Sequence, residues 1–314
     1  MSTATPAKAK NEKWANIKKI VYRDRYLFLM FAPIFIYYIV FHYLPMTGAI
    51  IAFKDYKPGR GIYNGEWVGL KWFIQYFKSP YAFRTIRNTI LISFYQIAIG
   101  FPIPILFAVC VTEIKQMAFR RVVQTVSYLP HFISTVVLVG MMKQMFTMNN
   151  GIVNKFVVLF GGDIINFLND PAWFRTMYVG SGIWQSFGFS SIIYIAAITG
   201  IDPTLYEAGK IDGITKFKEA WYITLPMISQ TVVTLFILRL GNILSVGFEK
   251  VFLMYSPAVY ETADVISTYV YRKGIESTTY SFASAVGLFN SVVNFMFVFI
   301  ANQVSRKLTD SSLW

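Results

Sequence analysis

Charged side chains are scarce in this chain of 314 residues. Only 14% of the residues are Asp, Glu, Lys or Arg, whereas 55% are hydrophobic; soluble domains carry about 25% charged residues. The apolar residues gather in runs of about 20, the length that crosses a bilayer and that soluble helices seldom need. The low charge therefore argues against a water-soluble domain and indicates a chain surrounded mostly by lipid.

Cysteine and histidine are rarer still. The single thiol, Cys110, lies in an apolar stretch and has no second thiol with which to form a disulfide or a metal cage. We expect it to be a small buried hydrophobic residue. His42 and His131 lie far apart in the sequence, without zinc-ligand spacing, so no metal site is expected.

Motifs for nucleotide binding and catalysis are also missing. No Gly-x-x-x-x-Gly-Lys-Ser/Thr phosphate loop occurs, and the stretch Gly59-Arg60-Gly61 lacks the lysine. No Ser-His-Asp or paired-carboxylate pattern stands out. We therefore expect that the chain is not an enzyme and binds no cofactor. The net charge of +13 does not form a basic stripe among stacking aromatics, so nucleic acid is not an expected partner.

Six apolar segments are long enough to be membrane spans. They lie at about 26–43, 89–111, 122–146, 177–199, 228–246 and 282–304. Several contain proline, which is tolerated where neighbouring helices satisfy the freed backbone groups. The predicted fold class is an all-α membrane protein with six transmembrane helices and a structured cytoplasmic loop between helices four and five.

The distribution of basic residues predicts how the chain is oriented. The polar leader before the first span is rich in Lys and Arg, which predicts that it lies in the cytoplasm. An even number of spans then puts the C-terminus on the same side. The predicted outer loops are basic too, so the bias is modest. We expect a basic cytoplasmic segment, a first span with its outer loop, a core of five spans and a cytoplasmic tail, at residues 1–25, 26–83, 84–304 and 305–314.

The loop after the fourth predicted span has the sequence of two short helices at a sharp angle. Asp202 is a good N-cap, Pro203 a good first helical residue and Gly213 a good left-handed helix end. A second helix is predicted over about 215–224. Small residues at Ala208 and Gly209 would let a partner pack closely, whereas a helix that only floats on lipid headgroups favours bulky apolar residues.

This loop resembles the coupling-loop signature of binding-protein-dependent ATP-binding-cassette importers. The signature is Glu-Ala-Ala, three residues, Gly, nine residues, Ile, one residue, Leu-Pro. The chain departs from it once, with Gly209 at the second alanine, a change that keeps the position small and costs about 1 kcal/mol of helix propensity. The resemblance implies an ATPase-coupling role for Glu207, Ala208, Gly209, Asp212, Gly213, Ile223, Leu225 and Pro226.

Within that superfamily the sequence is similar to oligosaccharide permeases of the maltose type, and most of all to the branch assigned to polysaccharide fragments. The resemblance implies a multi-pass protein of the bacterial inner membrane with both termini in the cytoplasm. It also implies a second homologous permease, two ATPase subunits that use ATP and Mg²⁺, and an extracytoplasmic solute-binding protein that delivers the sugar.

Two clusters in the fourth and fifth predicted spans combine amides or hydroxyls with aromatic rings, as a sugar site requires. They are Trp184, Gln185 and Phe189, and Asn242, Ser245 and Phe248. Other polar residues within spans, Arg239 among them, either bond neighbouring helices, reach the membrane surface or line the pathway.

The sequence is compatible with other functions. The cargo of such a permease can be a non-sugar solute such as glycerol phosphate or a peptide. A stand-alone secondary carrier is disfavoured because no Asp or Glu lies in the middle of any predicted span. A membrane scaffold that transports nothing has little need of a shaped docking loop. The basic outer loops suit an acidic sugar, although lysines beside anionic lipid explain them as well.

Overall fold

The computed structural model describes residues 19, 21–241 and 246–309, and it divides into two compact units, 1–68 and 69–314. In the described part of the first unit, the chain forms α2 (Arg25–Tyr38), η1 (Ile39–Tyr43), α3 (Leu44–Met46) and η2 (Thr47–Phe53). Strand β1 (Lys54–Asp55) then pairs antiparallel with β2 (Glu66–Trp67), with Lys54 opposite Trp67.

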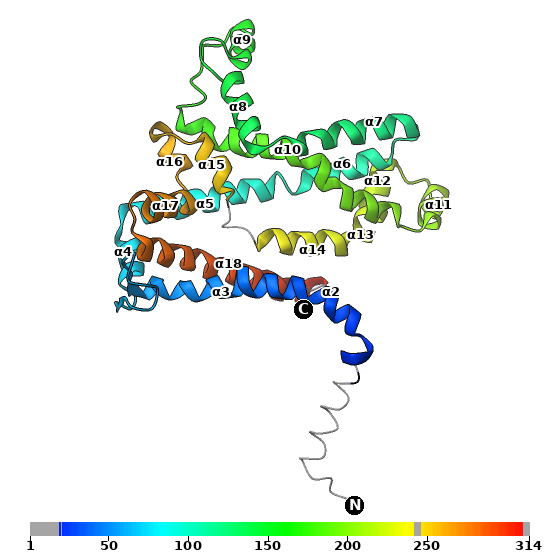
Figure 1. Cartoon of the computed structure of the whole chain (residues 1–314). Coiled ribbons are helices and arrows are strands. Elements are labelled where there is room, and N and C mark those ends of the chain that lie inside the picture. The colour runs from blue at the N-terminus through cyan, green and yellow to red at the C-terminus, as the bar shows by residue number, and fades with distance from the viewer. Residues whose placement is uncertain (1–18, 20, 242–245, 310–314) are drawn as a thin grey trace, which may run out of the picture. The chain divides into compact units, whose positions relative to one another are not determined.

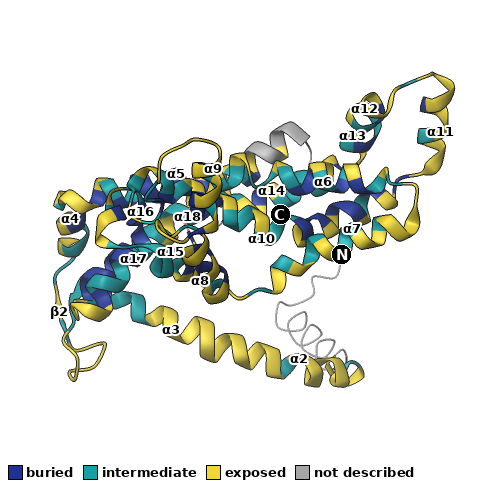
Figure 2. Ribbon diagram, turned by 90° about the horizontal axis from the view of Figure 1, so that it is seen from above, coloured by how far each residue is buried: buried dark blue, intermediate teal, exposed yellow. Residues whose placement is uncertain are grey.

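The helix of the first unit is apolar on all sides. No residue of α2 is buried within the chain, and its surface is exposed along its length (Figure 2). A helix that is apolar all round is stable only inside a protein core or in lipid. Residues 25–53 therefore form a membrane span, as predicted for 26–43.

The second unit is also built from helices in its described residues (Figure 1). Its first half contains α4 (Lys71–Lys78), α5 (Pro80–Ala98), α6 (Pro102–Thr112), α7 (Met117–Tyr128), η3 (Leu129–Phe132), α8 (Thr135–Met145), α9 (Ile152–Leu159) and α10 (Pro171–Thr199). Its second half contains α11 (Pro203–Ile211), α12 (Lys216–Glu219), η4 (Ala220–Thr224), α13 (Leu225–Met227), α14 (Ser229–Leu240), α15 (Phe248–Met254), η5 (Pro257–Val259), α16 (Tyr260–Ala263), α17 (Ile266–Tyr271), η6 (Arg272–Glu276) and α18 (Tyr280–Thr309).

The six predicted spans correspond to four long helices and two bent pairs. The long helices run over 25–53, 80–112, 171–199 and 280–303. The third predicted span is α7–η3 followed by α8, bent by 96° after Pro130. The fifth, predicted over 228–246, corresponds to α14, which meets the preceding segment 216–227 at a bend of 66°. One detail of the prediction is wrong: Cys110 is exposed rather than buried, because its side of α6 faces out of the chain.

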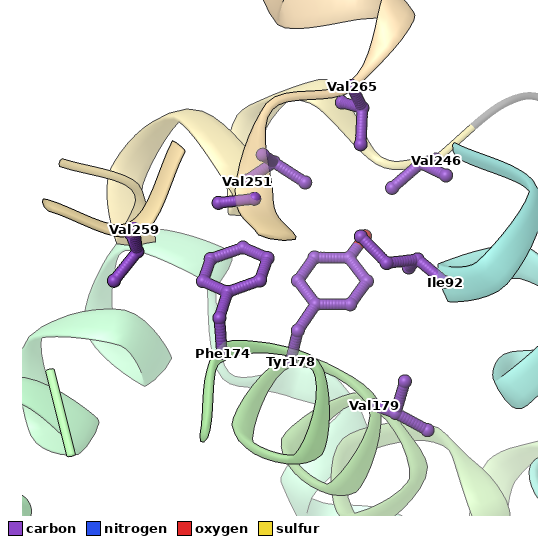
Figure 3. Close-up of a cluster of buried hydrophobic side chains, with 9 residues drawn as sticks. Ile92, Phe174, Tyr178, Val179, Val246, Val251, Val259 and Val265 are labelled. Carbon is purple, nitrogen blue, oxygen red and sulfur yellow. The ribbon is translucent and has the colours of Figure 1, made fainter. Parts of the chain in front are cut away.

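Helix α10 is the central element of the second unit. It runs from α15 and α16 at one end to α11 at the other (Figure 1). A Cβ at Gly188 would lie 2.0 Å from the carbonyl oxygen of Ser127, so only glycine allows α7 to approach this closely. Toward the other end, Phe174 and Tyr178 point into a buried cluster with Ile92, Val251 and Val265 (Figure 3). This packing fixes α15 against α10.

A buried carboxylate ties the same end together. Asp264 is fully buried and accepts from the guanidinium groups of Arg84 at 3.0 Å and Arg272 at 2.7 Å. Its second oxygen accepts from the Thr268 hydroxyl at 3.0 Å. The amide of Asn88 donates to the Asp264 backbone carbonyl, also at 3.0 Å. The carboxylate thus joins α5 to the segment that contains α16 and α17.

We predict that Asp264→Asn lowers the free energy of unfolding by about 3–5 kcal/mol, because it leaves two partly buried guanidinium groups without their counter-charge. The measurement is the midpoint of thermal unfolding in detergent, relative to wild type. Glu261→Gln is the control: the Glu261 carboxylate also pairs with an arginine, Arg87, but is 62% exposed, and we expect a loss of at most about 1 kcal/mol. Equal losses in the two variants would contradict the prediction.

Candidate functional site

The loop of residues 201–226, which we call the elbow, folds as predicted from its local sequence. The backbone N–H of Thr204 donates to the Asp202 carboxylate at 2.9 Å, which caps α11 and lowers the pKa of that carboxyl. Pro203 occupies the first helical position. Gly213 has φ +69°, a conformation that favours glycine, and ends the helix. The turn then leads into α12 and η4, where a second helix was predicted.

Gly209 faces the interior of the elbow, whereas the sequence indicated that it would contact a partner. It is buried, and a Cβ there would lie 2.6 Å from Cδ1 of Ile214 and 3.0 Å from Cδ1 of Ile223. The small residue thus lets α11 pack on the rest of the elbow, not on a partner. Ala208 is exposed and keeps the predicted outward position. The difference arises because the contact with Ile214 and Ile223 depends on how the chain turns at Gly213.

Large apolar side chains are exposed on the elbow. Ile211 is 87% exposed at the end of α11 and Phe217 is 78% exposed on α12. Trp221 and Tyr222 on η4 are exposed as well. The acidic Glu207 and Asp212 lie on the exposed surface of the same segment. The elbow therefore presents apolar and acidic groups side by side.

The inner side of the elbow is held by polar contacts and a small apolar cluster. Lys216 pairs with Glu113 at 2.8 Å and with Glu219 at 2.9 Å. The hydroxyls of Tyr206 and Thr224 lie 3.2 Å apart. Leu225 packs on a buried cluster that includes Ile198 and Ile228, while Pro226 is exposed in α13. These contacts fix the elbow to the ends of α6, α10 and α14, beside a groove of about 440 Å³.

A second candidate site is a polar cavity of about 590 Å³ between α5, α10, α14 and α15. Its lining includes the amides of Gln96 and Gln185 and two cations, Arg239 and Lys250. The Gln185 amide nitrogen donates to the carbonyl of Ile133 at 2.7 Å, which fixes the side chain at the bend between η3 and α8.

An adjoining cavity of about 410 Å³ has aromatic walls. Phe101, Phe189 and Tyr194 line it, and it shares Arg239 with the polar cavity. The ring of Phe189 stacks on His131 with a centroid distance of 3.9 Å. The two cavities together follow α10 from Tyr178 to Tyr194.

The structure brings together only part of the predicted substrate cluster. Gln185 and Phe189 line the two cavities, whereas Trp184 is exposed on another side of α10 and lines neither. Phe248 instead stacks on Phe252 and packs in a tilted arrangement against Tyr271. Asn242 and Ser245 lie outside the described residues.

Lys250 was missed because it belongs to no predicted span. It lies on the short helix α15, where it is only 9% exposed. The available signal was a lysine inside the mostly apolar run that follows Gly247. Arg239 was among the polar residues of the predicted spans, but the sequence did not assign it to a binding site. Among the described residues no group of three His, Cys, Asp or Glu side chains has the arrangement of a metal site.

Long apolar helices, a protruding elbow and a polar interior cavity define a polytopic membrane permease. The family model described as binding-protein-dependent transport system inner membrane component matches residues 100–309. The chain belongs to this family of transport subunits.

Individual relatives agree with the family. The polygalacturonan/rhamnogalacturonan transport system permease protein YteP of Bacillus subtilis (strain 168) is 41% identical over 305 residues, which cover 97% of this chain and 95% of the relative. A crystal structure of a bacterial alginate ABC transporter in complex with an alginate pentasaccharide-bound periplasmic protein has a chain that is 42% identical, with a TM-score of 0.88.

That match covers 94% of this chain and 99% of the other. A second structure, of a bacterial ABC transporter involved in the import of the acidic polysaccharide alginate, matches with the same identity and coverages and a TM-score of 0.87. The fold of the whole transport subunit is therefore shared with these proteins.

We predict that Gly209→Leu opens the elbow, because the added side chain has to displace Ile214 and Ile223. Overpacking of this kind costs about 1–3 kcal/mol, which corresponds to about fivefold or more in the local opening equilibrium. The measurement is the rate of tryptic cleavage within 203–218 in detergent. Ala208→Leu, at the neighbouring exposed position, is expected to be cleaved at the wild-type rate. Equally fast cleavage of both variants would contradict the inward placement of Gly209.

Proposed function

We propose that this chain is a membrane-spanning subunit of an ATP-driven importer and that its elbow docks into a separate ATPase subunit at the cytoplasmic face. That partner uses ATP and Mg²⁺. It binds the elbow and moves the helices that are joined to it. The chain itself supplies the pathway.

The observation that carries this proposal is the surface of the elbow. Its inner contacts hold it as a unit, yet Ile211, Phe217 and Trp221 remain exposed. Exposed apolar patches on an ordered surface are typical of interaction sites. The exposed charges of the elbow do not decide between a protein and a lipid surface, because Glu207 and Asp212 are accompanied by Lys210 and Lys218. The apolar side chains on a structured cytoplasmic loop therefore carry the proposal.

The cargo we propose is an oligosaccharide or a polysaccharide fragment delivered by an extracytoplasmic solute-binding protein. The relative and the solved transporters are named for polygalacturonan, rhamnogalacturonan and alginate. The amides of Gln96 and Gln185 suit sugar hydroxyls, and the ring of Phe189 suits the C–H face of a pyranose.

The complete assembly that we propose contains a second homologous permease and two ATPase subunits. Both termini lie in the cytoplasm, on the same side as the elbow. The apolar surface of α2, which is exposed within the first unit, is then covered by lipid or by the second permease.

We predict that Ile211→Glu abolishes association with the ATPase, because it puts a charge where the partner has to bury an apolar side chain. The measurement is co-purification of the ATPase with the affinity-tagged permease pair, together with ATPase activity in proteoliposomes. We expect at least a tenfold loss of bound ATPase and an unchanged thermal midpoint of the permeases. Phe160→Glu is the matched control, since Phe160 is 85% exposed beyond α9, and it should retain the ATPase. Retention of full ATPase binding by Ile211→Glu would refute the docking role.

A further inference from the structure

We propose that the cavity between α5, α10, α14 and α15 accepts an acidic saccharide, a uronate oligomer, and that Arg239 and Lys250 meet its carboxylates. The inference rests on the proposed function, because it names the substrate class of the same pathway. It assigns charge selectivity to two residues of the membrane subunit itself.

The first argument is the charge of the two adjoining cavities. Their only charged lining residues among those that the structure describes are Arg239, which lines both, and Lys250. No Asp or Glu of the described chain lines either one. Volumes of about 410 and 590 Å³ fall within the roughly 300–1,000 Å³ of ligand sites. An anion thus meets two cations and no carboxylate there.

The second argument is the contrast with other cations of the same unit. Arg84 and Arg272 share the carboxylate of Asp264, and Arg87 pairs with Glu261. In the described part of the chain, neither Arg239 nor Lys250 has an ion pair within the same distance. Ionisable groups inside a membrane protein are costly and commonly mark the path of a substrate. Arg239 and Lys250 thus line the two cavities without a carboxylate partner among the described residues.

The third argument is that the position of Lys250 is built into the packing. Val251, its neighbour on α15, is fully buried in the cluster with Phe174 and Tyr178 (Figure 3). The ammonium donates to the carbonyl of Tyr178 at 2.9 Å and lies 4.9 Å from the centre of that ring. A Cβ at Gly182 would lie 3.2 Å from the Lys250 Nζ, so the glycine leaves room for it.

An ammonium has three donors, and among the described residues the structure records one acceptor for this one, the Tyr178 carbonyl. Burial lowers the pKa of Lys250 to about 8, and a nearby carboxylate would favour the charged ammonium. A bound carboxylate would supply the missing acceptor and counter-charge.

The fourth argument is the combination of charge with aromatic walls. Arg239 lies where the cation-lined cavity meets the one lined by Phe101, Phe189 and Tyr194. A small inorganic anion gains nothing from aromatic rings, whereas a pyranose ring with a carboxylate uses both kinds of group. Acidic polysaccharide is also the cargo named for one of the solved transporters.

The experiment measures equilibrium binding to the purified complex of permeases and ATPases, without the binding protein and in zwitterionic detergent. It therefore depends neither on delivery, nor on ATP hydrolysis, nor on anionic lipid. The probes are a galacturonate trimer and its methyl ester, which has the same rings without the charge. The variants are Arg239→Gln, Lys250→Met and the charge-retaining Arg239→Lys. Lys143→Gln is the control, an exposed lysine on α8 that lines neither cavity.

We expect wild type to bind the acidic trimer at least tenfold more tightly than the ester. Arg239→Gln and Lys250→Met should each weaken binding of the acid at least tenfold and of the ester less than twofold. Arg239→Lys and Lys143→Gln should stay within threefold of wild type for both probes. Equal wild-type affinity for acid and ester, or equal losses for both probes in the variants, would overturn the inference.

Failure of the acidic trimer to bind at millimolar concentration would overturn the inference as well. Docking of the ATPase on the elbow would still stand in that case, since its test does not involve the saccharide. Conversely, if the docking test failed while the saccharide bound in a charge-dependent way, the docking role would be refuted and the assignment of the cavity would stand.

Discussion

The distribution of the few carboxylates decides where this chain holds charge. In a low-dielectric interior a cation is stable beside a carboxylate or in a cavity that admits water or an anion. Asp264 takes two arginines at one end of α5 and closes that end as a packed junction. No comparable acid lies beside Arg239 or Lys250 among the described residues. The need of a buried cation for a counter-charge therefore stabilises the packing at Asp264, whereas at the cavities it favours a bound anion.

Helix α10 connects the receptive region with the elbow. It is continuous from Pro171 to Thr199, and it carries Gln185 and Phe189 in the two cavities. From Gln185 to its end it is about 21 Å long at the α-helical rise. The close approach at Gly188 fixes it against α7. A force applied to the elbow would therefore reach the cavity lining through a stiff rod, not through a flexible loop.

Local signals in the sequence predicted the elbow well, and tertiary contacts explain what they missed. The cap at Asp202 and the turn at Gly213 depend on neighbouring residues only, and both are confirmed. The inward position of Gly209 depends on the path of the chain after the turn. The spans follow from apolar length, but the 96° bend after Pro130 does not. Lys250 escaped because hydropathy identifies spans, whereas its burial comes from the packing of α15 on α10.

The balance of contacts at Lys250 also suits passage rather than storage. A pathway has to attract its substrate and then release it, so its sites must be favourable but not tight. The carbonyl and ring of Tyr178 already stabilise the ammonium, so an arriving carboxylate adds a partner to a group that is partly satisfied without it. Arg239 is exposed within its cavities and retains more water, which screens its attraction. If the proposed uronate oligomer binds there, Arg239 and Lys250 would therefore meet its carboxylates without holding them tightly.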